Sequence, residues 1–264
     1  MINCDFLKRI IIKIVYLVYC FLSKGDNVCP YCLASNFKIV FRKFGIVKIC
    51  RCLKCGLYWV NPIFRMNKFY DTLYVGEGLT TRLPSDKELN TRLNNNFEGT
   101  DKDRHFIIRW LKDNINGDRL LEFGSSWGYF LYQAQKAHFK PTGVEISEKR
   151  RSYGQNRLKL EIVPSMDILI SEHRIYDAIV TINTLEHLVS IHKLFKDFHA
   201  LLNKDGVIII VVPFIDLTKG NKVFKIMGAV HPLGFSEEFF KANMFKEGFT
   251  VEFCNELTIC RKIQ

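Results

Sequence analysis

The chain has 264 residues, of which 48% are hydrophobic, and this length and composition support one main domain with a buried core and a small additional module. No internal repeat or low-complexity tract is present, which excludes a repeat or low-complexity architecture. The formal net charge of +11 lies mainly at the start, because residues 1–60 hold ten Lys or Arg and two Asp. Such a basic front end suits nucleic acid, anionic lipid head groups or a phosphorylated sugar carrier, although solvated lysines explain it equally well.

Residues 1–26 are predicted to form a basic, amphipathic N-terminal segment. Its apolar run is interrupted by Lys8, Arg9 and Lys13, and the uninterrupted part from Ile14 to Leu22 is far shorter than the about 20 residues that a membrane span requires. No small-x-small cleavage site follows, so a signal peptide is not expected either. Two interpretations stay open: a helix that lies on a membrane surface, or a helix that packs on the rest of the chain or on a second copy.

Residues 27–61 carry two C-x-x-C pairs, separated by nineteen residues, at a spacing typical of zinc ribbons. The pairs are Cys29 with Cys32 and Cys52 with Cys55. Four thiolates can surround one ion at about 2.3 Å in a closed, structural site, and a module this short is expected to depend on its metal. The alternative is four unrelated reduced cysteines, and Cys50 is interpreted as a spare thiol. Nine cysteines with a metal quartet favour a reducing, cytoplasmic location.

Residues 62–100 are predicted to be a connector, rich in Asn, Thr and charge, whose helices and loops cover the mouth of a ligand site. The main domain is expected to cover residues 101–264. It begins with DKDRHFIIRWLKDNI, whose apolar side chains recur at helical spacing, so a helix from Asp101 is expected to cap the first strand.

The stretch RLLEFGSSWGYFL, from Arg119 to Leu131, is predicted to be a strand, a glycine turn and the start of a helix. This arrangement presents backbone N–H groups to a ligand, although such turns also take glycine for purely structural reasons. A second apolar strand ends in Glu145, seventeen positions after Gly128. That interval approximates the about 20 residues that place a carboxylate beside the first strand tip, where it suits ribose hydroxyls.

Three further segments extend the pattern. LEIVPSMDI ends near Asp167, YDAIVTINTLEHL contains a strand that ends near Asn183, and KDGVIIIVVPF is an almost continuous β-branched run. Continuous apolar strands are typical of a buried parallel sheet. The C-terminal tail has room only for a tight hairpin that turns near Asn255 and Glu256.

From Arg119 to about Phe249 the chain resembles class I S-adenosylmethionine-dependent methyltransferases. The match rests on five motifs in order: LLEFGSSWGYF, GVEIS, SMDI, YDAIVTINTLEHL and LLNKDGVIIIVVP. The resemblance implies an α/β, Rossmann-like, doubly wound and mostly parallel sheet of about seven strands with helices on both faces. Ser126 departs from the family by replacing the middle glycine of the loop. A nicotinamide-binding protein is less well supported, because G-x-G-x-x-G is missing.

The resemblance also implies residue roles. Glu122, Gly124, Ser126 and Gly128 would surround the methionine part of S-adenosylmethionine. Glu145 would hold the ribose. Asp167 and Ile168 would flank the adenine, and Asn183 would close the floor of the pocket. The rings of Trp127 and Tyr129 would face the sulfonium or, as aromatic residues at a helix start more often do, belong to the core.

Two histidines are candidates for the catalytic proton acceptor. His187, in LEHL, follows the fourth strand of the domain, and His231, in AVHPLGFS, lies in the segment where the family builds its acceptor pocket. A structural role, in which the histidine forms a hydrogen bond with the backbone of a loop, explains each of them equally well. The similar ubiquinone-pathway O-methyltransferases place another acid three residues before the E-H pair, sometimes to hold a divalent ion. Asn183 occupies that position here, so the sequence gives no support for a catalytic metal.

Three functional classes remain open. The first is a methyltransferase for a sugar, a sugar nucleotide or another small hydroxylated acceptor, because the ribbon, CGLYWVNP and HPLGFS are similar to bacterial enzymes of surface-polysaccharide pathways. The alternative is an RNA methyltransferase that grips rRNA or tRNA with the ribbon and its basic neighbours. The third is a noncatalytic adaptor, which intact Glu122, Gly124 and Glu145 disfavour. A cytoplasmic enzyme with S-adenosylmethionine, structural zinc and a small, sugar-type acceptor is expected. Peripheral membrane contact through residues 1–24 stays open, nucleic acid is the less favoured partner, and the oligomeric state is not predicted.

Overall fold

The computed structural model describes residues 14–65 and 82–263. The first half of the N-terminal segment and residues 66–81 of the predicted connector lie outside this range. The chain divides into two compact units. Of the described residues, the sheet unit contains 82–182, 196–211 and 248–263, and the ribbon unit contains 14–65, 183–195 and 212–247.

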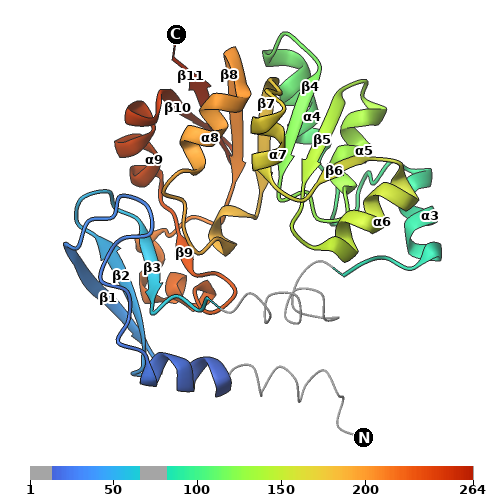
Figure 1. Ribbon diagram of the computed structural model, residues 1–264. Coiled ribbons are helices and arrows are strands. Elements are labelled where there is room, and N and C mark those ends of the chain that lie inside the picture. Colours follow the sequence, from blue (N-terminus) through green and yellow to red (C-terminus); the bar gives the residue numbers. More distant parts are fainter. Residues whose placement is uncertain (1–13, 66–81, 264) are drawn as a thin grey trace, which may run out of the picture. The chain divides into compact units, whose positions relative to one another are not determined.

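The sheet unit is built on seven strands in the order β10-β11-β8-β7-β4-β5-β6 (Figure 1). They are β4 (Arg119–Phe123), β5 (Lys140–Val144), β6 (Glu161–Val163), β7 (Tyr176–Ile182), β8 (Leu202–Val211), β10 (Phe249–Cys254) and β11 (Leu257–Lys262). The pairs from β8 to β6 are parallel, and β11 runs antiparallel to both of its neighbours. The order reverses between β4 and β7, the point at which doubly wound sheets bind ligands. The predicted fold class is confirmed.

Helices alternate with the strands of this sheet. They are α3 (Asp86–Asn94), α4 (His105–Asn114), α5 (Tyr129–Lys136), α6 (Glu148–Leu158), α7 (Met166–Ser171) and α8 (Leu194–Leu201), of which residues 196–201 belong to this unit. The predicted helix from Asp101 begins later, at His105, because the Asp103 carboxylate accepts the His105 backbone N–H at 2.9 Å and turns the chain before it.

Both faces of the sheet are buried. Side chains alternate along a strand, so Leu120 and Leu121 of β4 point to opposite faces. Leu120 belongs to a core cluster with Leu111 of α4 and Phe130 of α5, all fully buried. On the other face Phe123 meets Phe198 of α8 edge to face, with 5.4 Å between the ring centroids. Helices therefore cover both faces, as expected.

The C-terminal hairpin completes the sheet edge. β10 and β11 pair antiparallel over six residues each, from the Phe249–Lys262 pair to the Cys254–Leu257 pair. Asn255 occupies the turn with a φ of 53°, a left-handed conformation that asparagine tolerates better than most residues. The sequence prediction of a hairpin at this position is confirmed.

The ribbon unit contains a second, antiparallel sheet in the order β1-β2-β3-β9. Its strands are β1 (Phe37–Lys43), β2 (Val47–Cys52), β3 (Tyr58–Asn61) and β9 (Leu233–Gly234). The unit also holds η1 (Leu185–His187), η2 (Leu217–Ile226), α9 (Glu237–Asn243) and η3 (Met244–Glu247). The sequence analysis assigned residues 183–195 and 212–247 to the main domain and did not anticipate that β9 would extend the ribbon sheet; the domain boundaries remain a prediction.

Residues 14–22 form a helix of the ribbon unit. Tyr16 is buried and meets Phe64 edge to face at 5.7 Å, and the Tyr19 hydroxyl donates to the Ile63 carbonyl at 3.1 Å. Among the described residues, no helix combines the length and the apolar character needed to cross a membrane.

Candidate functional site

The glycine loop after β4 follows the carboxyl end of a parallel strand, as predicted. The Gly124 and Ser125 N–H groups both donate to the Val144 carbonyl at 2.9 Å, which ties the loop to the end of β5. Gly128 has a φ of 86°, a left-handed conformation that favours glycine, and a Cβ there would also displace the Leu160 side chain. Ser126 has a φ of 51°, in the left-handed region where a glycine would fit without strain. Ser126 therefore adopts the left-handed backbone conformation at the position where the similar enzymes have a glycine.

The Glu145 carboxylate lies against this loop. Its Oε2 atom accepts the Ser126 N–H at 2.9 Å, and its Oε1 atom accepts the Ser147 N–H at 2.8 Å. The side chain is only 7% exposed, and burial raises its pKa while the two N–H groups and nearby Arg150 oppose the rise. The strand spacing thus places an acid next to the first strand tip in a fixed orientation.

Several buried polar atoms around the loop have no hydrogen-bond partner among the described residues. They are Glu122 Oε2, Ser125 Oγ, Ser126 Oγ and Ser147 Oγ. Buried polar groups of a folded protein are nearly always paired, so a group of unpaired ones indicates room for a polar ligand. The loop N–H groups of Gly124, Ser125 and Ser126 are already bonded within the chain, so these side-chain oxygens are the groups that fit the methionine and ribose parts of an adenosyl cofactor.

Glu122 is buried in the sheet unit with 1% of its surface exposed. Burial raises its pKa well above the ordinary value, the Glu145 charge raises it further, and the Arg104 guanidinium opposes the rise. Arg104 precedes α4 and lies 5.7 Å from the centre of the Tyr129 ring. The sequence analysis missed Arg104, because no spacing pattern relates it to Glu122.

The other predicted cofactor residues follow successive strands. Asp167 and Ile168 are in the first turn of α7, after β6, and Asn183 directly follows β7 with a φ of 47°. Trp127 is fully buried in the core cluster, 5.8 Å from the Phe97 ring, and Tyr129 belongs to the same cluster. Both aromatic rings therefore have the core role that was the alternative to a sulfonium contact.

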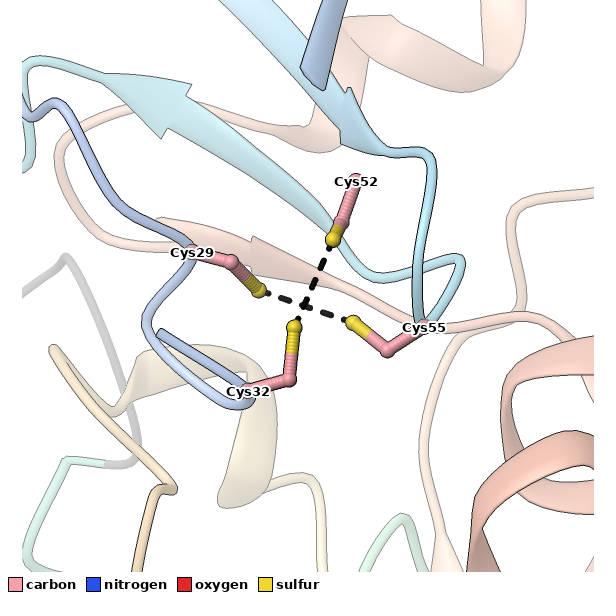
Figure 2. Close-up of side chains that lie close together, drawn as sticks. All are labelled: Cys29, Cys32, Cys52 and Cys55. Carbon is pink, nitrogen blue, oxygen red and sulfur yellow. Dashed lines mark hydrogen bonds between the residues drawn. The ribbon is translucent and has the colours of Figure 1, made fainter. Parts of the chain in front are cut away.

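The four ribbon cysteines converge in the ribbon unit, and Figure 2 shows their sulfur atoms pointing toward one another. All four Sγ atoms lie within 4.8 Å of each other, and two pairs, Cys29 with Cys55 and Cys32 with Cys52, are 3.5 Å apart. Four sulfurs at about 2.3 Å from one tetrahedral ion would be about 3.8 Å apart, whereas a disulfide requires about 2.05 Å. The geometry fits a metal quartet. Cys50 is buried outside it.

Backbone and side-chain contacts hold this quartet to the rest of its unit. The Asn243 side chain of α9 donates to the Cys55 carbonyl at 2.8 Å, and the Ile191 N–H donates to the Pro30 carbonyl at 3.1 Å. The Val60 N–H of β3 donates to the Pro232 carbonyl at 2.9 Å, next to His231. The ribbon is therefore packed into the segments that follow β7 and β8 in the chain.

The two histidine candidates meet in the ribbon unit. The ring centroids of His187 and His231 are 4.5 Å apart, and Glu186 joins them so that one ligand atom of each lies within 4.8 Å of the other two. Burial raises the pKa of Glu186 to about 7 and lowers that of His231. The sequence analysis treated the histidines separately and missed Glu186, although it directly precedes His187.

The raised pKa of Glu122 predicts a specific pH dependence of stability. Between the ordinary pKa of a glutamate and the higher pKa of Glu122 in the folded chain, the folded chain binds more protons than the unfolded chain. The contribution of Glu122 to the free energy of unfolding is therefore highest at acidic pH and falls as the pH rises through this window. Glu122→Gln removes the charge at nearly constant volume. We expect its free energy of unfolding to exceed that of the unchanged protein above the window and to approach it at acidic pH. Urea unfolding at several pH values measures this, with exposed Glu148→Gln as the control; parallel profiles for Glu122→Gln and the unchanged protein would contradict it.

Comparison with known proteins gives a family for the chain. The model of a family described as a methyltransferase domain matches residues 97–252. No curated protein matches the chain.

The chain is similar to solved structures of methyltransferases over part of its length. An S-adenosylmethionine-dependent methyltransferase from Archaeoglobus fulgidus is 16% identical with a TM-score of 0.48, over 67% of this chain and 100% of its own. One from Mesorhizobium loti is 15% identical with a TM-score of 0.47, over 59% and 96%. The magnesium protoporphyrin IX methyltransferase from Synechocystis, solved with bound S-adenosylhomocysteine, is 13% identical with a TM-score of 0.47, over 74% and 93%. Because the family model spans more than half of its 264 residues, the chain belongs to the methyltransferase domain family, and the expectation that it is an enzyme is confirmed.

Proposed function

We propose that the protein transfers a methyl group from S-adenosylmethionine to a small hydroxylated acceptor, namely a sugar or sugar nucleotide of surface-polysaccharide biosynthesis. The observation that carries the choice of donor is the Glu145 carboxylate, which two backbone N–H groups fix beside the glycine loop. The choice of acceptor rests on the resemblance of the ribbon and of the CGLYWVNP and HPLGFS segments to polysaccharide-pathway enzymes.

The donor supplies an activated methyl group on a sulfonium sulfur. We assign its ribose to Glu145, its methionine part to Glu122 and the loop, its adenine to the α7 start, and the pocket floor to Asn183. In the loop these residues are Gly124, Ser126 and Gly128, and in α7 they are Asp167 and Ile168. Rate acceleration would come mainly from holding the acceptor atom in line with the methyl carbon, with His187 or His231 as the group that removes the acceptor proton.

Glu145→Ala tests the donor assignment. The substitution removes the acceptor of the ribose hydroxyls and also releases the Ser126 and Ser147 N–H groups, and hydrogen bonds to charged groups contribute about 1.5–3 kcal/mol each. We expect S-adenosylhomocysteine to bind at least about 100-fold more weakly, by isothermal titration calorimetry. Exposed Glu148→Ala is the matched control on α6 and should bind normally. Unchanged affinity in Glu145→Ala would exclude this residue from the cofactor site.

The acceptor is tested by incubating the protein with methyl-labelled donor and fractionated cell extract. We expect label in the RNA-free sugar-nucleotide and glycolipid fractions, and none with Glu145→Ala. Label that appears only in RNA, with binding that weakens steeply as salt increases, would instead support the alternative function in rRNA or tRNA modification.

We propose that the cysteine quartet holds a structural zinc ion. Its supports are the four converging sulfurs, which leave a tetrahedral ion no open position, and the ribbon's short length.

Cys52→Ser is expected to abolish this site and to loosen the ribbon sheet, because β2 carries Cys52 and a closed zinc site contributes directly to folding. Cobalt substitution gives the measurement: the intense thiolate-to-cobalt absorption of the unchanged protein should disappear. Cys50→Ser, a change at a buried cysteine of the same strand, should keep it. An intact cobalt spectrum in Cys52→Ser would rule out Cys52 as a ligand.

We also propose a cytoplasmic enzyme that contacts membranes through residues 1–24. The helix over residues 14–22 supports this, because its buried Tyr16 and Cys20 leave an exposed apolar row. That row consists of Ile14, Val18, Phe21 and Leu22, which are 50–75% exposed. An apolar helix face beside basic residues is typical of interfacial helices.

A further inference from the structure

We propose that Glu186, His187 and His231 bind a divalent transition-metal ion through one carboxylate oxygen and two imidazole nitrogens. This site is separate from the cysteine quartet and differs from it in chemistry. It goes beyond the proposed function, because metal binding here requires neither the methyl donor nor methyl transfer. With an ion bound, the lone pairs of both histidines are used in coordination, so His187 or His231 would serve as the proton acceptor only in the metal-free protein.

The fold brings these residues together from two distant parts of the sequence. Glu186 and His187 form most of η1, while His231 lies 44 positions after His187, just before β9. β9 pairs with β3, through Trp59 opposite Leu233, and this pairing fixes the chain next to His231. One ligand atom of each residue lies within 4.8 Å of the others, a limit that includes the about 3.0–3.5 Å separations that bonds of about 2.1 Å to one ion produce.

Backbone carbonyls select the same tautomer for both histidines. His187 Nδ1 lies 2.7 Å from the Val230 carbonyl, and His231 Nδ1 lies 3.1 Å from the Ile226 carbonyl. A carbonyl oxygen only accepts, so each Nδ1 must carry the proton, and each neutral ring then has its lone pair on Nε2. Histidines that bind metals are usually oriented in this way, with the second ring nitrogen donating to a carbonyl or carboxylate.

The carboxylate completes the donor set. Glu186 is only 3% exposed, and its Oε2 atom has no hydrogen-bond partner among the described residues. A buried carboxylate without compensation is costly, and a cation held jointly with two imidazoles would remove that cost.

The donor set also indicates the class of ion. Two imidazoles and one carboxylate suit zinc, manganese, iron, cobalt or nickel, whereas magnesium and calcium prefer oxygen ligands alone. Three protein ligands leave at least one coordination position for an oxygen atom of water or of a hydroxylated molecule.

The test uses the full chain with its cysteine quartet already loaded with zinc, titrated with Mn²⁺, which prefers nitrogen and oxygen to thiolate ligands. We expect one Mn²⁺ per chain by electron paramagnetic resonance, and electron spin echo modulation from histidine nitrogens coupled to the bound ion. Glu186→Gln and His231→Gln should each weaken binding at least about tenfold. His192→Ala, an exposed histidine of the same unit, should bind like the unchanged protein.

Variants are compared only where the cobalt-substituted quartet keeps its thiolate absorption, which shows that the ribbon unit is folded. The measurement on the unchanged protein is sufficient to test the proposal. If this protein binds no Mn²⁺, or if its bound Mn²⁺ shows no coupling to nitrogen, the proposal is wrong. Normal S-adenosylhomocysteine affinity with no Mn²⁺ binding would overturn the metal site alone, whereas Mn²⁺ binding without cofactor affinity would contradict the proposed function alone.

Discussion

The carboxylate of Glu145 links the glycine loop, the end of β5 and the start of α6. Parallel pairing places Phe123 opposite Val144, so the chain leaves both strands at the same edge of the sheet. Glu145 then accepts one N–H from the glycine loop and one from the start of α6. A charged acceptor with two N–H donors is stronger than a neutral one, and this compensates for burying the acid. The loop is therefore shaped before any cofactor arrives, which reduces the entropy lost on binding.

In the ribbon unit, the equivalent constraint is the pairing of β3 with β9. Two residues of β9 are enough to align it, because the Pro232 carbonyl and the Asn243 side chain add bonds on either side. The ribbon sheet thus also supports residues 226–243, the segment that contains His231.

The sequence was sufficient to predict those features that depend on the spacing of residues close together in the chain. The loop from Gly124 to Gly128, the acid at Glu145 and the cysteine pairs all follow from intervals along one strand or turn, and the sheet follows from apolar β-branched runs. It was insufficient where residues meet through tertiary contacts. Arg104 acts on Glu122 from the start of α4, and no periodic pattern relates the two. The ribbon sheet ends in a two-residue strand, too short for any propensity to indicate.

Glu186 is another residue that the sequence does not single out, because its neighbour His231 is distant in the chain and lies close to it only in the folded structure. In the sequence, Asn183 stands where related enzymes place a ligand, which argued against a metal beside His187. In three dimensions the segment before β9 brings His231 beside Glu186 and His187, where it would supply the third ligand of the proposed site. The two metal-binding arrangements of this unit would then differ in kind: a closed set of soft sulfurs suits a structural ion, and an open set of nitrogen and oxygen suits an ion that exchanges ligands. Because β2, which carries Cys52, pairs with β3, and β3 pairs with β9 beside His231, loss of the first ion should weaken binding of the second without any direct contact between them.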